Sequence, residues 1–540
     1  MKINRIGAVV VGLGIAAALT LTGCSTGGGA KPSATSTANA TAIITANGSE
    51  PQNPLIPTNT NETGGGKITD NIFAGLVYYK ADGTPVNDVA SSIKTTDAQN
   101  YTIKIKPGLK FTNGEPVTAK SFVDAWQYGA LLSNNQLNSY FFESIQGFSY
   151  DNDSPLTGLK VVDNTTFTVA LKDKEADFPL RLGYTAFMPL PAVAFKDIKA
   201  FGENPIGNGP YKLKSPTAWQ HNVKIDLIAN PEYTGPRKAK NGGLSIVFYA
   251  TEDAAYADLQ SGTLDVLDSV PSADLKTYKT DFPGRYVNQP AAIFQSFTIP
   301  QNLPHFTGAE GKLRRAALSM AINRDQITKV IFEGTRTPAT DFTSPVIAGY
   351  SKSLPGSDVL KFNAAQAKKD WAAADKISPW SGTFQIGYNA DGGHQGWVDA
   401  VTNSIKNTLG IQASGAPYPT FAQFRTVVTK RTITTAFRTG WQADYPALFN
   451  FLGPLYATNA GSNDGDYSSA KFDGLLKEGQ AQTNVEAANK LFKQSQTVLF
   501  TDLPAIPLWY SNVTGAYGKS VSDVKFGWNS VPIYTDIAKG

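Results

Sequence analysis

The sequence contains one cysteine and three histidines among its 540 residues. Because Cys24 has no second cysteine to pair with, no intramolecular disulfide can form. The histidines stand far apart and show no metal-ligand spacing, so we expect no metal and no cofactor. These are His221, His305 and His394.

Motifs for nucleophilic catalysis are also missing. No Gly-x-Ser-x-Gly occurs, and the two Ser-x-x-Lys matches fit a surface segment at Ser91 and a helix start at Ser468. We therefore expect no catalytic residues and no enzyme.

The net charge is small as well. It is +4, with no long basic run, and two of the positive residues, Lys2 and Arg5, lie at the amino end. Nucleic acid is therefore not an expected partner. At 540 residues the chain is too long for one hydrophobic core and should form two or three domains.

The amino end has the layout of an export signal. An apolar run, Ile6 to Leu21, follows Lys2 and Arg5, and it is too short and too interrupted by glycine for a permanent membrane span. Residues 21–24, Leu-Thr-Gly-Cys, resemble the bacterial lipobox, which implies cleavage of a signal peptide at residues 1–23 and diacylation of Cys24. Residues 24–42 are mostly small and should form a flexible tether. We expect a body anchored by lipid at the extracytoplasmic face of the bacterial cell membrane.

The most informative scaffold block is residues 101–126. Apolar and polar residues alternate over 101–106, which predicts a half-buried strand. Asn113 and Gly114 form a turn signal, and Thr118 can cap a helix whose Phe122 and Trp126 share one face.

This block resembles the signature of the family 5 extracellular solute-binding proteins, the oligopeptide- and dipeptide-binding receptors of ABC importers. Residues 204–211, Asn-Pro-Ile-Gly-Asn-Gly-Pro-Tyr, and residues 313–327 are similar to the same family. The resemblance implies an α/β, periplasmic-binding-protein-like type II fold with two lobes joined by a hinge and an additional subdomain in the first lobe. We expect lobe I at 43–75, 190–295 and 510–540, the subdomain at 76–189 and lobe II at 296–509. Within lobe II we expect one helix over 312–333, with Arg314, Arg315 and Arg324 away from its apolar side.

The candidate ligand site is the stretch Arg438–Pro446. By itself it could be a core Trp, a turn-forming Asp and a loop-fixing Pro. In the resembled family, however, W-x-A-D-Y lines the cleft and its aspartate holds the free α-amino group of the ligand, which here is Asp444. Gly440 and Gln442 would offer main-chain groups to a peptide, and Trp441 would wall the cleft. Arg438 is a candidate either for a carboxylate of the ligand or for a structural ion pair between the lobes. Lys430–Arg431 is interpreted as a solvated helix end.

The second candidate segment is Asn61–Lys67. It suggests a phosphate loop, but Asn61 stands where the first glycine belongs and Ile68 where Ser or Thr should follow the lysine. We expect a flexible loop before a helix that runs through Ile72 to Val77. In the resembled family this loop contributes backbone contacts, so Asn61 and Thr63 are candidate ligand residues.

Together these features predict a monomeric solute-binding lipoprotein that captures oligopeptides and delivers them to an ABC permease with its ATPase subunits. One alternative is a receptor of the same fold for an oligosaccharide, a nickel chelate or an opine, since Trp380, Trp397 and Trp441 suit sugar stacking. The other is a secreted peptide hydrolase.

Overall fold

The computed structural model describes residues 39–390, 393–419 and 421–540. The expected signal peptide, Cys24 and most of the tether lie outside these residues. Within the described part, no helix has the length and hydropathy needed to cross a membrane.

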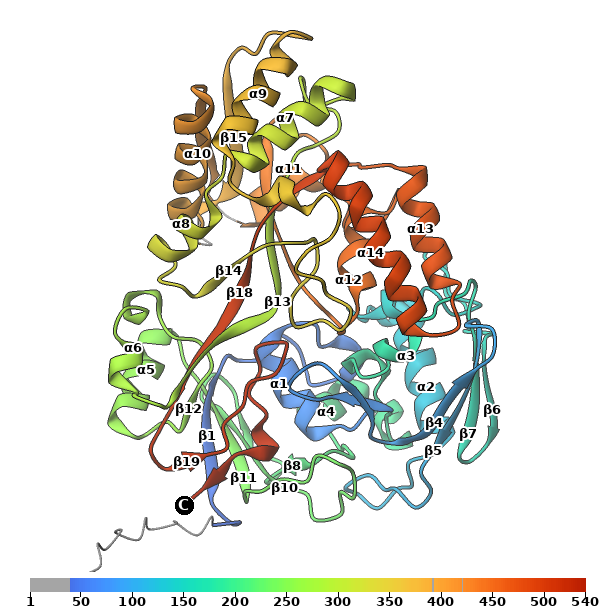
Figure 1. The fold of residues 1–540 in the computed structure, drawn as a ribbon. Helices are drawn as coiled ribbons and strands as arrows, with labels where there is room; N and C mark the ends of the chain where they lie inside the picture. Colours follow the sequence, from blue (N-terminus) through green and yellow to red (C-terminus); the bar gives the residue numbers. More distant parts are fainter. Residues whose placement is uncertain (1–38, 391–392, 420) are drawn as a thin grey trace, which may run out of the picture. The chain divides into compact units, whose positions relative to one another are not determined.

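Most of the described strands belong to one large mixed sheet that runs through the body (Figure 1). Its twelve described strands follow the order β16-β15-β17-β13-β18-β12-β1-β11-β10-β8, with β14 on β18 and β9 on β10. The bounds are β1 Ile43–Gly48, β8 Tyr211–Leu213, β9 Trp219–Gln220, β10 Lys224–Ala229, β11 Gly243–Phe248, β12 Val266–Leu267, β13 Tyr286–Thr298, β14 Arg336–Pro338, β15 Thr383–Asn389, β16 Gln412–Tyr418, β17 Ala436–Gln442 and β18 Ala505–Tyr517.

Two long antiparallel strands, β13 and β18, join the halves of this sheet (Figure 1). Beyond them, β18 pairs with β12 on one side and β13 pairs with β17 on the other. Their register shifts between Pro290 and Phe294. Val287 packs on one hydrophobic core and Ala292 belongs to another, so the chain passes between the two cores at this irregularity.

The first core includes a separate four-stranded sheet in the order β4-β5-β7-β6, covered by α2. As predicted, β5 alternates buried and exposed residues, and Thr118 forms a capping box with Ser121. Phe122 and Trp126 are fully buried. The bounds of these and the neighbouring elements are β2 Val77–Tyr79, β3 Pro85–Asn87, β4 Ala90–Thr95, β5 Asn100–Ile105, β6 Leu159–Asp163, β7 Thr166–Ala170, β19 Val521–Ser522, β20 Ala538–Lys539, α1 Thr63–Ile72, α2 Ala119–Ala130, α3 Phe178–Arg181, α4 Ile198–Glu203, α5 Glu252–Ser261 and α6 Tyr278–Asp281.

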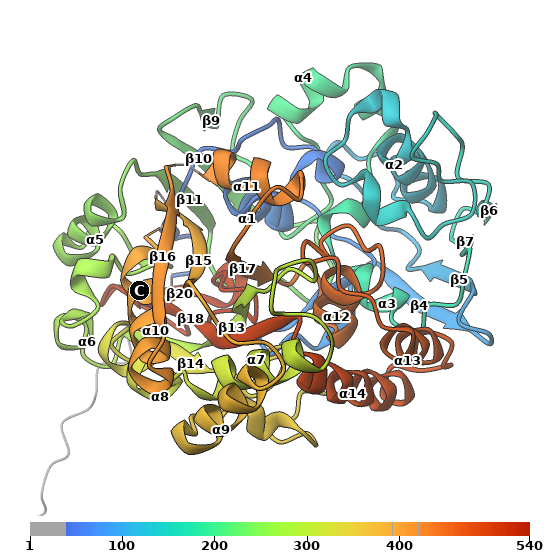
Figure 2. The ribbon, with the colours of Figure 1, turned by 90° about the horizontal axis from the view of Figure 1, so that it is seen from above.

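The second core lies among the helices that follow β13. Seen from above, α14 runs beside α13, and α7 lies near α9 (Figure 2). The bounds are α7 Gly308–Met320, α8 Arg324–Val330, α9 Ala364–Asp375, α10 Gln395–Leu409, α11 Phe421–Thr429, α12 Leu448–Tyr456, α13 Ala470–Gln480 and α14 Val485–Asp502.

Two local predictions were wrong. The expected helix over 312–333 is two helices, because α7 ends at Met320 and Asn323, with φ −83° and ψ 83°, leaves helical geometry and caps α8 by accepting from the amide of Gln326. The arginines expected away from the apolar side are also buried: Arg314, Arg315 and Arg324 are 0%, 2% and 4% exposed.

The expected flexible loop at 61–67 is largely helical. Glu62 accepts a 2.8 Å hydrogen bond from the amide of Gly65, so α1 starts at Thr63 within the glycine run. A Cβ on Gly65 would lie 2.5 Å from the Glu62 carboxylate, so the glycine leaves room for this cap. The helix ends at Ile72, and Val77 begins strand β2.

Candidate functional site

The strand that carries most candidate residues, β17, has one partly open edge. Along one edge, residues 437–442 pair with residues 293–298 of β13. Along the other, the described residues of β15 pair only with Ala436 and Phe437. Gly440 and Gln442 are exposed. The segment from residue 438 to 442 thus leaves main-chain groups that no described strand uses.

A single amide holds the end of this stretch. Asn450, in the first turn of α12 and 2% exposed, accepts hydrogen bonds from Trp441 Nε1 at 3.1 Å and from the Asp444 amide at 3.0 Å. Its own Nδ2 donates to Asp444 Oδ2 at 3.2 Å. Asn450 therefore fixes both the indole and the carboxylate. Sequence reasoning missed it, since an asparagine inside an apolar helix carries no recognisable pattern.

The carboxylate of Asp444 is largely withdrawn from water and has no cationic partner within the described part of the chain. Burial raises its pKa to about 6, although the hydrogen bond from Asn450 opposes this shift. A buried carboxylate is usually stabilised by a lysine or arginine that forms an ion pair with it. Here one neutral amide does so, and the charge is left incompletely compensated.

The charge of Asp444 acts on tyrosines from a distant part of the sequence. The pKa values of Tyr140 and Tyr184 are raised first by burial and next by the charge of Asp444. Tyr79 also feels this charge, while burial is the main cause of its raised pKa. The fold therefore brings Asp444 within electrostatic reach of side chains from a distant part of the sequence. These tyrosines were not among the predicted site residues, because only the fold brings them to residue 444.

Arg438 contacts residues of β15 and α11. Its Nε donates to Asn389 Oδ1 at 2.9 Å, and its guanidinium lies 5.6 Å from the centre of the Phe424 ring. Asn389 is the last residue of β15, so the contact stands where β15 and β17 separate.

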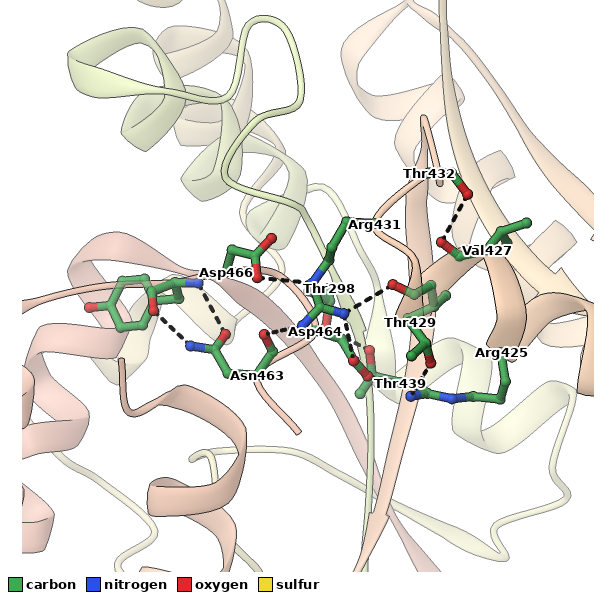
Figure 3. Close-up of polar contacts among 12 residues, drawn as sticks. Thr298, Arg425, Val427, Thr429, Arg431, Thr432, Thr439, Asn463, Asp464 and Asp466 are labelled. Atoms are coloured by element: carbon green, nitrogen blue, oxygen red, sulfur yellow. Dashed lines mark hydrogen bonds and ion pairs between the residues drawn. The ribbon is translucent and has the colours of Figure 1, made fainter. Parts of the chain in front are cut away.

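A charged cluster braces α11 beside β17 (Figure 3). Arg425 Nη1 lies 2.7 Å and Arg431 Nη1 3.1 Å from the two oxygens of Asp464. Arg431 Nε also contacts Asp466 at 2.9 Å. The solvated helix end predicted for Lys430–Arg431 is confirmed for the exposed Lys430, whereas the partly exposed Arg431 also forms a bridge to the loop after α12.

The other segment with candidate residues approaches the same tyrosines. Asn61 and Thr63 are both exposed. The carbonyl of the preceding Thr60 accepts hydrogen bonds from Asn138 at 2.8 Å and from Thr185 at 3.4 Å. Because Thr185 follows Tyr184, these contacts hold residue 60, just before α1, beside the segment that carries Tyr184.

Residues considered for other chemistry have structural contacts. His221 binds Glu50 and Glu203, and His305 binds Glu310. In the described residues no group of three potential ligands could hold a metal ion. Trp380 packs on Trp371 at 5.2 Å and Trp397 on Trp509 at 5.5 Å, so these two indoles belong to the second core.

Comparison with known proteins gives the same picture. The family described as bacterial extracellular solute-binding proteins, family 5 Middle, matches residues 84–463. The oligopeptide-binding protein OppA of Bacillus subtilis is 25% identical over 492 residues, with 87% of this chain and 88% of that protein covered. Periplasmic OppA of Escherichia coli is 26% identical over 499 residues, with 89% of each covered. The probable deoxycholate-binding protein YgiS of Escherichia coli is 26% identical over 487 residues, with 84% and 85% covered.

Solved structures share the fold. The unliganded open form of the periplasmic murein tripeptide-binding protein MppA has a TM-score of 0.79 at 21% identity and covers 93% of this chain and 98% of its own. Haemophilus influenzae OppA, in complex with the peptide RPPGFSPFR, has a TM-score of 0.73 at 20% identity and covers 93% and 100%. The fold is therefore the α/β type II binding-protein fold, as predicted. With more than half of its length matched by the family, the chain belongs to the family 5 bacterial extracellular solute-binding proteins.

Proposed function

We propose that this solute-binding protein captures oligopeptides by their free amino end and delivers them to an ABC permease. The observation that carries the proposal is the carboxylate of Asp444, largely buried, with one neutral donor and no cation among the described residues. A peptide α-ammonium carries the charge and the three donors that this group lacks.

The strand next to Asp444 supports a peptide rather than a simple amine. The segment from residue 438 to 442 has a main-chain edge that no described strand pairs with. At about 3.3 Å per residue this edge spans the length of four or five peptide residues. Main-chain pairing of this kind gives affinity with little regard for side chains, so broad peptide tolerance follows.

The rest of the proposal concerns place and partners. Residues 43–75, 190–295 and 510–540 form lobe I, 76–189 the additional subdomain and 296–509 lobe II, with the paired β13 and β18 as the hinge. Lipid on Cys24 holds the monomeric body at the extracytoplasmic face of the cell membrane, where the permease and its ATPase subunits receive the ligand. Labelling with a radioactive fatty acid checks the anchor: the label should be lost on Cys24→Ala and kept in the wild type.

The test of the peptide site removes the charge of Asp444 and keeps the shape of its side chain. Leaving one member of a buried ion pair alone costs about 3 kcal/mol or more, so Asp444→Asn should weaken binding of a free-amine pentapeptide more than a hundredfold. The N-acetylated peptide should bind the wild type weakly and be nearly insensitive to the substitution. Calorimetry with both peptides measures this.

The control is Asp358→Asn, which removes an acidic side chain that is 87% exposed. It should leave both affinities unchanged. If Asp444→Asn weakens the free and the acetylated peptide equally, Asp444 does not hold the α-amino group.

The alternatives make different predictions. YgiS, with an identity similar to that of the OppA proteins, is named for deoxycholate, which is an anion. An anionic ligand would be repelled by the carboxylate of Asp444, because no cation among the described residues lies beside that carboxylate to offset its charge. The site therefore favours a ligand that carries an amine. A peptide hydrolase would return cleaved products, whereas a receptor returns its ligand intact. Mass spectrometry of peptides after incubation with the protein distinguishes the two.

A further inference from the structure

The structure contains a cavity of about 480 Å³ whose lining differs from the set of predicted peptide contacts. Its walls come from the last turn of α1, from β2 and the residues after it, and from the carboxyl-terminal segment 525–536. None of Asp444, Trp441, Gly440, Gln442, Arg438, Asn61 or Thr63 lines it. The volume falls within the range of small-molecule binding sites, roughly 300–1,000 Å³.

Asp70 presents a carboxylate to this cavity without a partner. No hydrogen bond or ion pair joins its side chain to the described residues; only its main-chain carbonyl is used, by Arg237 Nη1 at 2.6 Å. Burial raises the pKa of Asp70 to about 6, and the charge of Arg237 opposes the shift.

The cations that line the cavity are engaged or lie at its exposed side. Arg237 donates from Nε to Asp88 at 3.1 Å and from Nη2 to the carbonyl of Phe73 at 3.0 Å. Lys525 is exposed and lies 4.0 Å from Asp536. Lys80 is also exposed, as is the neighbouring Asp82. The interior charge without a counter-ion is therefore the negative one, on Asp70.

Aromatic rings line the same space. Tyr79 meets Trp528 edge to face, with the ring centres 5.5 Å apart. Trp528 is only 4% exposed, and its carbonyl accepts a 2.8 Å hydrogen bond from the amide of Ala292, which fixes the segment. The ring of Tyr78 also lies on the cavity, 5.8 Å from the Arg237 guanidinium. Aromatic faces beside a carboxylate attract an organic ammonium more strongly than a hydrated inorganic ion.

We propose that this cavity is a second binding site, for a small organic ammonium ion, with Asp70 as the counter-ion and Tyr79 and Trp528 as aromatic walls. None of the predicted peptide contacts lines this cavity, although the charge of Asp444 acts on Tyr79. The ligand of the cavity needs a cationic head and a compact apolar body, and it makes no use of a peptide main chain.

The experiment compares choline with 3,3-dimethyl-1-butanol, which has the same shape and no charge, by calorimetry on the full chain at pH 7.5. Pentylamine is the primary-ammonium probe. At least one of the two cations should bind with a 1:1 stoichiometry and at least tenfold more tightly than the neutral alcohol. If neither cation saturates the protein, or if the alcohol binds equally well, the proposal is overturned.

Two variants locate the binding. Asp70→Asn should weaken the bound cation at least tenfold, whereas Asp82→Asn, at an exposed lining residue, should change it less than twofold. If Asp70→Asn does not fold, Trp528→Leu should weaken the cation and leave the alcohol unchanged. Loss of cation binding in Asp444→Asn, with Asp70→Asn unaffected, would assign the cation to the peptide site instead and overturn the proposal. Failure of the peptide proposal would leave the cation result untouched.

Discussion

Two regions of the second core bury charge in opposite ways. Arg315 has no ion pair among the described residues, but its guanidinium donates to main-chain carbonyls, those of Ile299, Pro300, Phe306, Leu503 and Pro504. Asp444 receives one side-chain hydrogen bond, from Asn450. Burial lowers the pKa of Arg315 to about 10 and raises that of Asp444 to about 6, so both groups lose hydration. The difference is that the protein replaces the lost water around the arginine with carbonyl groups and leaves the carboxylate incompletely compensated, which is the basis of the ligand role that we propose for it.

Two buried arginines, Arg315 and Arg324, donate to main-chain carbonyls near or within the strands that join the two cores. Arg315 reaches carbonyls just after β13 and just before β18. Arg324, on α8, donates at 2.8 Å to the carbonyl of Pro507 in β18 and at 2.5 Å to that of Leu360, which lies outside both strands. Arg315 thus links the two strands that join the cores, and Arg324 holds β18 to the segment before α9, so both have structural roles.

The largest expected effect follows from Arg315→Met. The substitution leaves several buried carbonyls without hydrogen-bond donors and should lower the free energy of unfolding by at least about 3 kcal/mol. Arg315→Lys should recover little of the lost stability, because one compact ammonium cannot reach all of the carbonyls that the guanidinium contacts. Urea unfolding measures both, with Lys329→Met on an exposed position of α8 as the control. If the free energy of unfolding falls by less than about 1 kcal/mol, the carbonyl partners of Arg315 contribute little, and the contrast with Asp444 does not lie in how fully each charge is hydrogen-bonded.

The next effect is the pH dependence of peptide binding. Only ionised Asp444 pairs with an ammonium, and its pKa is about 6. Between pH 7 and pH 5 the ionised fraction falls about tenfold, so affinity for a free-amine peptide should fall about tenfold, or about 1.4 kcal/mol. Above pH ~8 the peptide amine loses its proton and affinity should fall again. Calorimetry from pH 5 to 9 gives the profile, and Asp444→Asn should lack its acidic limb.

A smaller effect, with the opposite sign to that of Arg315→Met, is expected for the stability of the unliganded protein. Because burial raises the pKa of Asp444 in the folded state, ionisation opposes folding above about pH 6, and protonation stabilises the fold as pH falls through 6 toward 4. Asp444→Asn should therefore raise the free energy of unfolding at pH 7 by about 1 kcal/mol, a value discounted for partial exposure. The gain should shrink at pH 4.5. Equal destabilisation at both pH values would indicate that the carboxylate is structural.

How far the sequence predicts this molecule depends on the range of the contacts involved. Alternation in β5 and the cap at Thr118 are local, and both were correct. The single helix over 312–333 was wrong, because Asn323 caps a new helix inside a run that looks continuous. The burial of Arg315 depends on carbonyls as distant as Leu503, which no local pattern contains.

The candidate site divides in the same way. The family resemblance placed attention on Asp444 and Trp441, which Asn450 holds together. Tyr140 and Tyr184 reach Asp444 only through the fold, so nothing in the sequence near residue 444 indicates them.

The smallest effect tests a charge that is satisfied at the surface. Arg431 contacts Asp464 at 3.1 Å and Asp466 at 2.9 Å, and its side chain is 35% exposed (Figure 3). Water can replace these contacts, so Arg431→Gln should lower the free energy of unfolding by no more than about 1 kcal/mol. The loss should diminish in 1 M salt, which screens exposed charges, whereas that of Arg315→Met should not. Urea unfolding at both salt concentrations makes the comparison. A loss comparable to that of Arg315→Met would mean that burial does not decide which charges the fold depends on.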